Sequence, residues 1–77
     1  MNRVRREKLK KIIHQIEELQ NQLVTVQDEE QEAYDNMPES LQMSERGSEM
    51  EEYIDQMEEA WDKLEDAIGI LDYIADF

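Results

Sequence analysis

The chain has 77 residues, of which 21 are Asp or Glu and eight are Lys or Arg, so its formal net charge is −13. A chain of this length forms one domain at most, and its core is small enough that self-association or a partner is expected to stabilise it. The absence of cysteine excludes a disulfide framework, a thiolate metal site and a thiol nucleophile. Because the excess acid disfavours direct contact with nucleic acid or anionic lipid, we expect any charged partner to be basic, either a protein or a cation.

The distribution of apolar residues bears on the expected location. The longest apolar run, residues 67–71, is far shorter than the ~18 residues that a membrane-crossing helix needs. An apolar core typical of secretion signals does not follow the basic N-terminus. We therefore expect a cytoplasmic protein that makes no contact with a membrane. We also expect that it needs no cofactor.

The first long helix is predicted by apolar residues that recur three and four positions apart, as on one face of an α-helix. These residues are Leu9, Ile12, Ile16, Leu19, Leu23 and Val26. Glu30 continues the series with a charge and weakens it, so we place the helix at about residues 3–35. The stripe is narrow and suits a single neighbouring helix.

The turn region, residues 36–48, contains the only proline and one of the two glycines of the chain. Asn36 and Glu39 have the spacing of a helix-capping box, and Pro38 would lie in the first turn, where its missing N–H is not needed. This pattern predicts one isolated helical turn over residues 38–42.

The second long helix is predicted to begin at about residue 48, because Ser48 and Glu51 have the spacing of another capping box. Ser44 is an alternative start, although Gly47 would then lie in the first turns, where glycine is a poor helix former. An apolar stripe runs to residue 75 and consists of Met50, Ile54, Met57, Trp61, Leu64, Ile68, Leu71 and Ala75. A flanking apolar column consists of Tyr53, Ala60, Ala67 and Ile74.

Two long helices joined by a turn predict an all-α fold, an antiparallel helical hairpin with coiled-coil packing that forms one domain over residues 1–77. The broad stripe of the second helix exceeds what one neighbouring helix covers, so we expect two hairpins to form a homodimeric four-helix bundle. Antiparallel pairing would bring residues 3–11, which hold six bases and one acid, beside the acidic residues 65–76.

A resemblance to a known group of proteins lies in the turn region and beyond it. The run from Tyr34 to Arg46 contains the pattern Asn-x-Pro-Glu-x-Leu-Gln-x-Ser-Glu, and Glu- and Leu-rich repeats follow it. Over residues 29–71 the chain resembles small acidic helical proteins encoded by phages and prophages of Gram-positive bacteria. The resemblance implies a phage origin and a location in the host cytoplasm. It also implies a likeness to inhibitors of host nucleic-acid-processing or defence proteins, such as anti-CRISPR proteins and DNA mimics.

Acidic residues form two rows on the second helix. Neighbours in such a row lie ~5 to 6 Å apart, which is comparable to the separation of phosphates along a nucleic-acid strand. The candidate partner-binding residues are Glu51, Glu52, Asp55, Glu58, Glu59, Asp62, Glu65 and Asp66. Like charges at this spacing destabilise a helix, which favours a use for them in binding. The alternative is an ordinary solvated surface.

Two carboxylate pairs raise the possibility of catalysis. Glu29 with Glu32, and Glu52 with Asp55, have the spacing with which all-α nucleoside triphosphate pyrophosphatases hold Mg²⁺. Acids are so frequent in this chain that such pairs recur by chance, so we expect neither an enzyme nor a bound metal. The sequence favours a non-catalytic interaction protein that inhibits a basic host protein through an acidic, DNA-mimicking face. A structural coiled-coil or assembly protein is the alternative.

Overall fold

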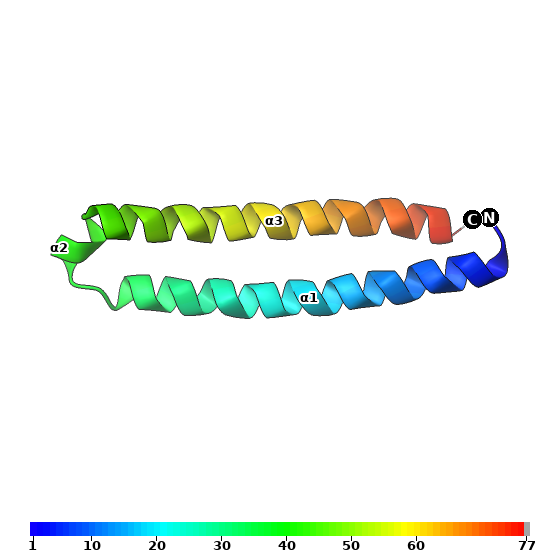
Figure 1. Ribbon diagram of the computed structural model, residues 1–77, viewed down its shortest axis with the longest axis horizontal. Coiled ribbons are helices and arrows are strands. Elements are labelled where there is room, and N and C mark those ends of the chain that lie inside the picture. The colour runs from blue at the N-terminus through cyan, green and yellow to red at the C-terminus, as the bar shows by residue number, and fades with distance from the viewer. Residues whose placement is uncertain (77) are drawn as a thin grey trace.

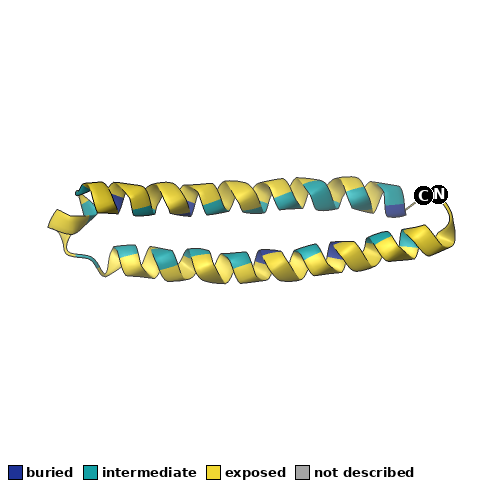
Figure 2. Ribbon diagram, in the orientation of Figure 1, coloured by how far each residue is buried: buried dark blue, intermediate teal, exposed yellow. Residues whose placement is uncertain are grey.

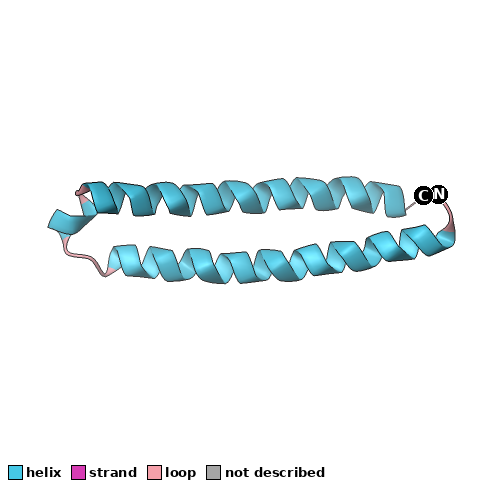
Figure 3. Cartoon of the chain, in the orientation of Figure 1, coloured by secondary structure: helices cyan, strands magenta, loops and turns pink. Residues whose placement is uncertain are grey.

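The computed structural model describes residues 1–76 of the protein. These residues form three helices. They are α1 (Arg3–Asp35), the one-turn α2 (Glu39–Gln42) and α3 (Glu45–Ala75). The two long helices lie side by side and run in opposite directions, so the N-terminus and the end of α3 lie at the same end of the molecule (Figures 1 and 3). No strand occurs among the described residues, and the predicted all-α hairpin is confirmed.

The hairpin is long and thin, with extents of 58 × 15 × 12 Å. Its buried apolar residues are Ile13, Ile54 and Ala75, and no described side chain is completely shielded from solvent. Neither long helix, over the residues described, is long and apolar enough to cross a membrane. Most of the chain therefore remains at the surface of a two-helix layer.

An asparagine caps each end of α1. The side chain of Asn2 accepts a hydrogen bond from the N–H of Arg5 at 2.9 Å. At the other end, the N–H of Asn36 donates to the carbonyl oxygen of Glu32 at 3.0 Å. The predicted capping box of Asn36 is therefore wrong, because Asn36 closes α1 and no side chain caps α2. The isolated helical turn itself is confirmed over Glu39–Gln42, but Pro38, which was expected in its first turn, precedes the helix as its N-cap.

Helix α3 starts at Glu45, so the alternative start at Ser44 is confirmed and the start at about residue 48 is wrong. Ser44 caps the helix by accepting a hydrogen bond from the N–H of Gly47 at 3.4 Å, whereas Ser48 lies inside the helix. A Cβ atom at Gly47 would lie 2.0 Å from the carbonyl oxygen of Gln42. The glycine that argues against an early start in the sequence is thus required by the close approach of α2 to the first turn of α3.

The seam between α1 and α3 contains the residues that are least exposed (Figure 2). On α3 the predicted stripe is confirmed, because all eight of its residues are buried or half-buried. On α1 the seam consists of Arg6, Leu9, Ile13, Ile16, Gln20, Leu23, Gln27, Glu30 and Tyr34.

Helix α1 is turned by one position relative to the prediction. Ile12, Leu19 and Val26 were expected in the seam, but they are 43%, 56% and 52% exposed. The residue that follows each of them lies in the seam instead. The prediction is wrong for these three residues, and an apolar column of α1 is left at the surface.

Hydrogen bonds across the seam explain why polar residues occupy it. Gln20, which is 4% exposed, donates from Nε2 to the carbonyl oxygen of Trp61 at 3.3 Å and to Oε2 of Glu65 at 3.1 Å. One heptad further along α1, Gln27 donates to the carbonyl oxygen of Ile54 at 3.4 Å. Because buried polar groups are stable only when they are hydrogen-bonded, these bonds fix both the rotation of α1 and its register against α3.

The expected charge pairing between the helix ends is not formed by ion pairs. Residues 3–11 do lie toward the same end of the molecule as residues 65–76 (Figure 1). However, the ion pairs among the described residues join side chains of the same helix, as in Lys10 with Glu7 at 4.0 Å and Lys63 with Glu59 at 3.8 Å. Among residues 1–76, charge at this end therefore acts through its general field and not through ion pairs between the helices.

Candidate interaction surfaces

One flank of the hairpin is apolar. Ile12 directly precedes the seam residue Ile13, and Ala67 directly precedes the seam residue Ile68. Because the helices are antiparallel, residues in these equivalent positions lie on the same side of the seam. The resulting surface, here called the apolar face, consists of Ile12, Leu19, Val26, Tyr53, Ala60, Ala67, Ile70 and Ile74.

The apolar face itself contains no acid, although more than a quarter of the residues in the chain are acidic. Glu29 and Glu49, one heptad from Gln22 and Gln56, border it at the turn end. The polar residues between its members on the two helices are Gln15, Gln22, Gln56 and Lys63. The sequence prediction included the α3 part of this surface as the flanking column. It missed the α1 part, because Ile12, Leu19 and Val26 were assigned to the seam.

The eight predicted partner-binding carboxylates are all exposed and lie together on α3. They occupy the outer side of the helix and the flank opposite the apolar face. This surface is here called the acidic face. The two surfaces therefore divide the hairpin into a flank whose acids, Glu29 and Glu49, lie only at its turn end and a flank that is acid-rich throughout α3, a division that the spacing within one helix does not predict.

Two carboxylates of the acidic face are held in place by α1. The hydroxyl group of Tyr34 donates a hydrogen bond to Oε1 of Glu51, and Gln20 donates to Glu65. Tyr34 and Gln20 are not among the predicted site residues, because both belong to the seam column that lies one position after the predicted apolar stripe of α1. Their hydrogen bonds fix the orientation of the two carboxylates before any partner binds.

The remaining carboxylates of the acidic face differ in their contacts. Glu52 accepts a hydrogen bond from Gln56 at 3.2 Å, and Glu59 lies 3.8 Å from Lys63. Four carboxylates make no hydrogen bond or ion pair with another described residue: Asp55, Glu58, Asp62 and Asp66. These four are available to bind cationic groups of another molecule.

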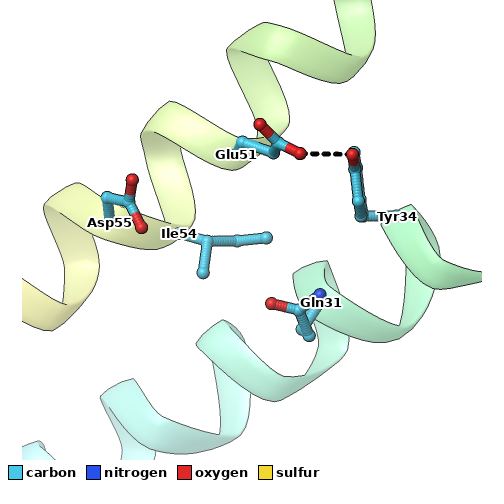
Figure 4. A pocket seen from close by; sticks show the side chains of 5 residues that line it. All are labelled: Gln31, Tyr34, Glu51, Ile54 and Asp55. Atoms are coloured by element: carbon cyan, nitrogen blue, oxygen red, sulfur yellow. Dashed lines mark hydrogen bonds between the residues drawn. The ribbon is translucent and has the colours of Figure 1, made fainter. Parts of the chain in front are cut away.

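A shallow hollow of about 230 Å³ lies near the turn end of the acidic face. It is lined by Gln31, Tyr34, Glu51, Ile54 and Asp55, and the hydrogen bond between Tyr34 and Glu51 crosses it (Figure 4). That hydrogen bond, followed by desolvation and the nearby acidic charges, raises the pKa of Tyr34 above its usual value of 10.0. The phenol therefore stays protonated, and the carboxylates of the hollow offer acceptors for an ammonium or guanidinium group.

The two carboxylate pairs considered for Mg²⁺ are not brought together as a metal site. Glu32 and Glu52 lie on the outer sides of their helices, away from the seam. Within residues 1–76, no group of three or more Asp, Glu or His side chains is arranged to hold a metal ion. The described geometry thus lends no support to the pyrophosphatase alternative.

Comparison with known proteins adds no assignment. Comparison with protein-family models gave no match, and comparisons with curated proteins and with solved structures gave none either. The two faces of the hairpin therefore carry the functional inference.

Proposed function

We propose that the chain is a non-catalytic protein-interaction module whose acidic face binds the nucleic-acid-binding surface of a basic protein. The observation that supports this proposal is the segregation of charge, since eight carboxylates share one side of α3 while the apolar face holds none. Like charges three and four positions apart destabilise a helix. If the charge served solubility alone, we would expect it to be spread over both flanks, where fewer like charges would be neighbours.

The acidic face has features suited to replacing a phosphate backbone. Its rows place negative charges ~5 to 6 Å apart along a straight helix. Glu51 and Glu65 are oriented in advance by hydrogen bonds from α1, which lowers the entropy lost on binding. Given the resemblance of residues 29–71 to phage-encoded proteins, we propose a host nucleic-acid-processing or defence protein as the partner, inhibited by occupation of its nucleic-acid site.

We further propose that the functional unit is a homodimeric four-helix bundle. Two helices alone bury little apolar surface, as the thin seam of this hairpin shows. The apolar face would complete the core when it is covered by a second hairpin. Dimerisation would also double the number of acidic faces presented to a partner.

The proposal can be tested by reversing charge on the acidic face. We expect the variant Asp55→Lys/Glu58→Lys/Asp62→Lys to bind the partner captured from a host lysate at least tenfold more weakly than wild type. Wild-type binding should weaken steeply with salt, and duplex DNA should compete with it. The matched control, Glu18→Lys/Asp28→Lys/Glu32→Lys, makes the same change in net charge on α1 and should retain binding. Mimicry is wrong if the α3 variant binds as well as wild type at two salt concentrations.

The assembly-protein alternative is favoured by one observation, the exposed apolar face. An assembly protein should tolerate charge reversal on the acidic face and lose its assembly when the seam is damaged. Trp61→Ala and Leu64→Ala are suitable seam variants because both residues are half-buried between the helices. Measuring binding and particle mass for both sets of variants separates the two functions.

A further inference from the structure

The apolar face has a defined occupant. We infer that it is covered by the apolar face of a second copy of this chain that runs in the opposite direction, so that the two turns lie at opposite ends of the dimer. This inference rests on the proposed homodimer, and it adds the surface and the direction of the pairing.

The surface area of the hairpin supports an interface of this size. The accessible surface is 6014 Å², whereas a compact monomer of 9.3 kDa is expected to expose about 5,000 Å². The excess is roughly 1,000 Å² per chain, and a specific protein interface of standard size buries about 800 Å² per partner. Covering one flank of the hairpin would remove this excess.

The chemistry of the apolar face suits a second copy better than any other occupant. Two chains that each carry a net charge of −13 repel each other, so they pack most closely where acids are few or lie opposite bases. The apolar face meets this condition on both copies, and a two-fold axis allows the same surface to be used twice. The acidic face remains outside such a dimer and free for another partner.

The direction of the pairing follows from the charges of the two halves of the hairpin. Gln20 bonds to Trp61 and Glu65, so residues 1–19 lie beside residues 64–76. This terminal half holds six bases and seven acids, a net charge of −1. The turn half, residues 20–63, holds two bases and fourteen acids, a net charge of −12.

A dimer with both turns at one end would pack the two turn halves, each of charge −12, against each other. Packed helices lie ~8 to 10 Å apart, which is close to the screening length of ~8 Å at physiological salt, so this repulsion is only partly screened. A dimer with its turns at opposite ends packs each turn half against a terminal half of charge −1. The second arrangement is therefore much less repulsive.

The two arrangements also pair different helices. With the turns at opposite ends, α1 packs on α1 of the second copy and α3 on α3. Residues 3–11, with six bases and one acid, then lie near residues 28–35 of the other copy, which hold five acids and no base. With the turns at one end, α1 packs on α3 of the second copy, and residues 28–35 lie near another acidic segment, residues 48–55.

The surface is tested by placing a lysine on either flank of α1. Leu19 belongs to the apolar face, whereas Val24 is an exposed apolar residue on the opposite flank and serves as the matched control. In size-exclusion chromatography with light scattering, wild type and Val24→Lys should have twice the mass of the 9.3 kDa chain. Leu19→Lys should have the mass of one chain. A dimeric Leu19→Lys variant would show that another surface forms the dimer.

The direction is tested by cross-linking between single-cysteine variants, since the chain has no cysteine of its own. A short bis-maleimide should join Ile12→Cys to Val26→Cys in a mixed sample, and Leu19→Cys to itself, because α1 of each copy then lies on α1 of the other. Ile12→Cys mixed with Ala67→Cys should give little product. The reverse pattern would show that the turns lie at the same end and overturn the inference.

The two proposals fail in different ways. A wild-type protein that has the mass of one chain over a wide concentration range contradicts the proposed dimer itself. A dimer that gives neither the Ile12–Val26 nor the Leu19–Leu19 product contradicts only the surface and direction inferred here. Binding of the acidic face to a basic partner is measured separately and does not depend on either result.

Discussion

Tyr34 is the residue whose chemistry depends most clearly on the fold. It lies near the turn end of α1 and donates a hydrogen bond to Glu51 of α3. The hydrogen bond exists only while the phenol is protonated, and the neighbouring carboxylates oppose the formation of a tyrosinate. The folded state therefore favours the protonated phenol more strongly than the unfolded state does.

This raised pKa predicts a loss of stability at alkaline pH. The contribution of Tyr34 to the free energy of unfolding is complete below the unfolded pKa of about 10 and is lost as the pH rises through the higher folded value. Wild type should therefore melt at a higher temperature than Tyr34→Phe at about pH 8, and the difference should shrink toward about pH 11. Thermal melts followed by circular dichroism measure it. A difference that stays constant over this range would contradict the assigned hydrogen bond.

Gly47 shows the effect of one missing side chain on the turn. A Cβ atom there would overlap the backbone of Gln42, so we expect Gly47→Ala to lower the free energy of unfolding by ~1 to 3 kcal/mol. Gly69 is the matched control, because a Cβ atom there would meet nothing within 4 Å. Gly69→Ala should stabilise the protein by ~0.5 to 1 kcal/mol, since alanine is the better helix former. Urea denaturation of both variants gives the two values.

At the scale of the helices, glutamine fixes the register of α1 against α3. The amide of Gln20 donates to the carbonyl oxygen of Trp61 and to the exposed carboxylate of Glu65. The carbonyl group of Trp61 lies inside α3, where it also accepts a hydrogen bond of the helix backbone. Removing this amide leaves no buried group unpaired, because Glu65 can bond to water. Gln20 thus specifies one register of α1 against α3, but it stabilises the hairpin less than an apolar residue at this position would.

Replacing this glutamine by leucine should separate stability from alignment. Gln20→Leu adds apolar surface to the seam, so its melting temperature should rise. The same variant should show broader amide signals in NMR spectra, because alternative registers become accessible. Leu23→Gln is a useful opposite change in the neighbouring seam position and should lower the melting temperature. A lower melting temperature for Gln20→Leu would mean that the hydrogen bonds outweigh the apolar gain.

The two long helices differ in how well their sequences predict the fold. The stripe of α3 is apolar throughout, so its periodicity alone identifies every seam residue. On α1 two neighbouring sets of residues follow a helical spacing: Ile12, Leu19 and Val26, and the residue after each of them. The first set is apolar throughout, whereas the second contains Gln20 and Gln27. Apolar periodicity therefore favours the first set, although the second lies in the seam. The bonds of Gln20 and Gln27 to α3 are tertiary contacts that the local sequence of α1 does not reveal.

The candidate surfaces show the same limit. The acidic face could be predicted, because eight exposed carboxylates are visible in the spacing of one helix. The apolar face could not be predicted in full, because it combines residues of two helices and depends on the rotation of α1. Gly47 is a poor helix former by its residue type, and only the close approach of Gln42 to it explains why a glycine is needed there.

At the scale of the whole molecule, uneven charge opposes folding. The turn half carries a net charge of −12, and its acids lie on a layer only 12 Å thick. Added salt should therefore raise the melting temperature at neutral pH by screening this repulsion. Asp55→Lys/Glu58→Lys/Asp62→Lys should melt higher than wild type at low salt and respond less to added salt. An equal response of both proteins would indicate that the acidic face contributes little to the repulsion.

The antiparallel path of the chain also sets the order in which the hairpin can form. Gln27 and Ile54 are separated by 27 positions in the chain, whereas Gln20 and Trp61 are separated by 41. Contacts near the turn close the shortest loops, and each later layer extends a helix pair that already exists. Folding should thus proceed as a zipper from the turn toward the termini. The zipper begins in the half with the strongest repulsion, so salt should accelerate folding more than it slows unfolding.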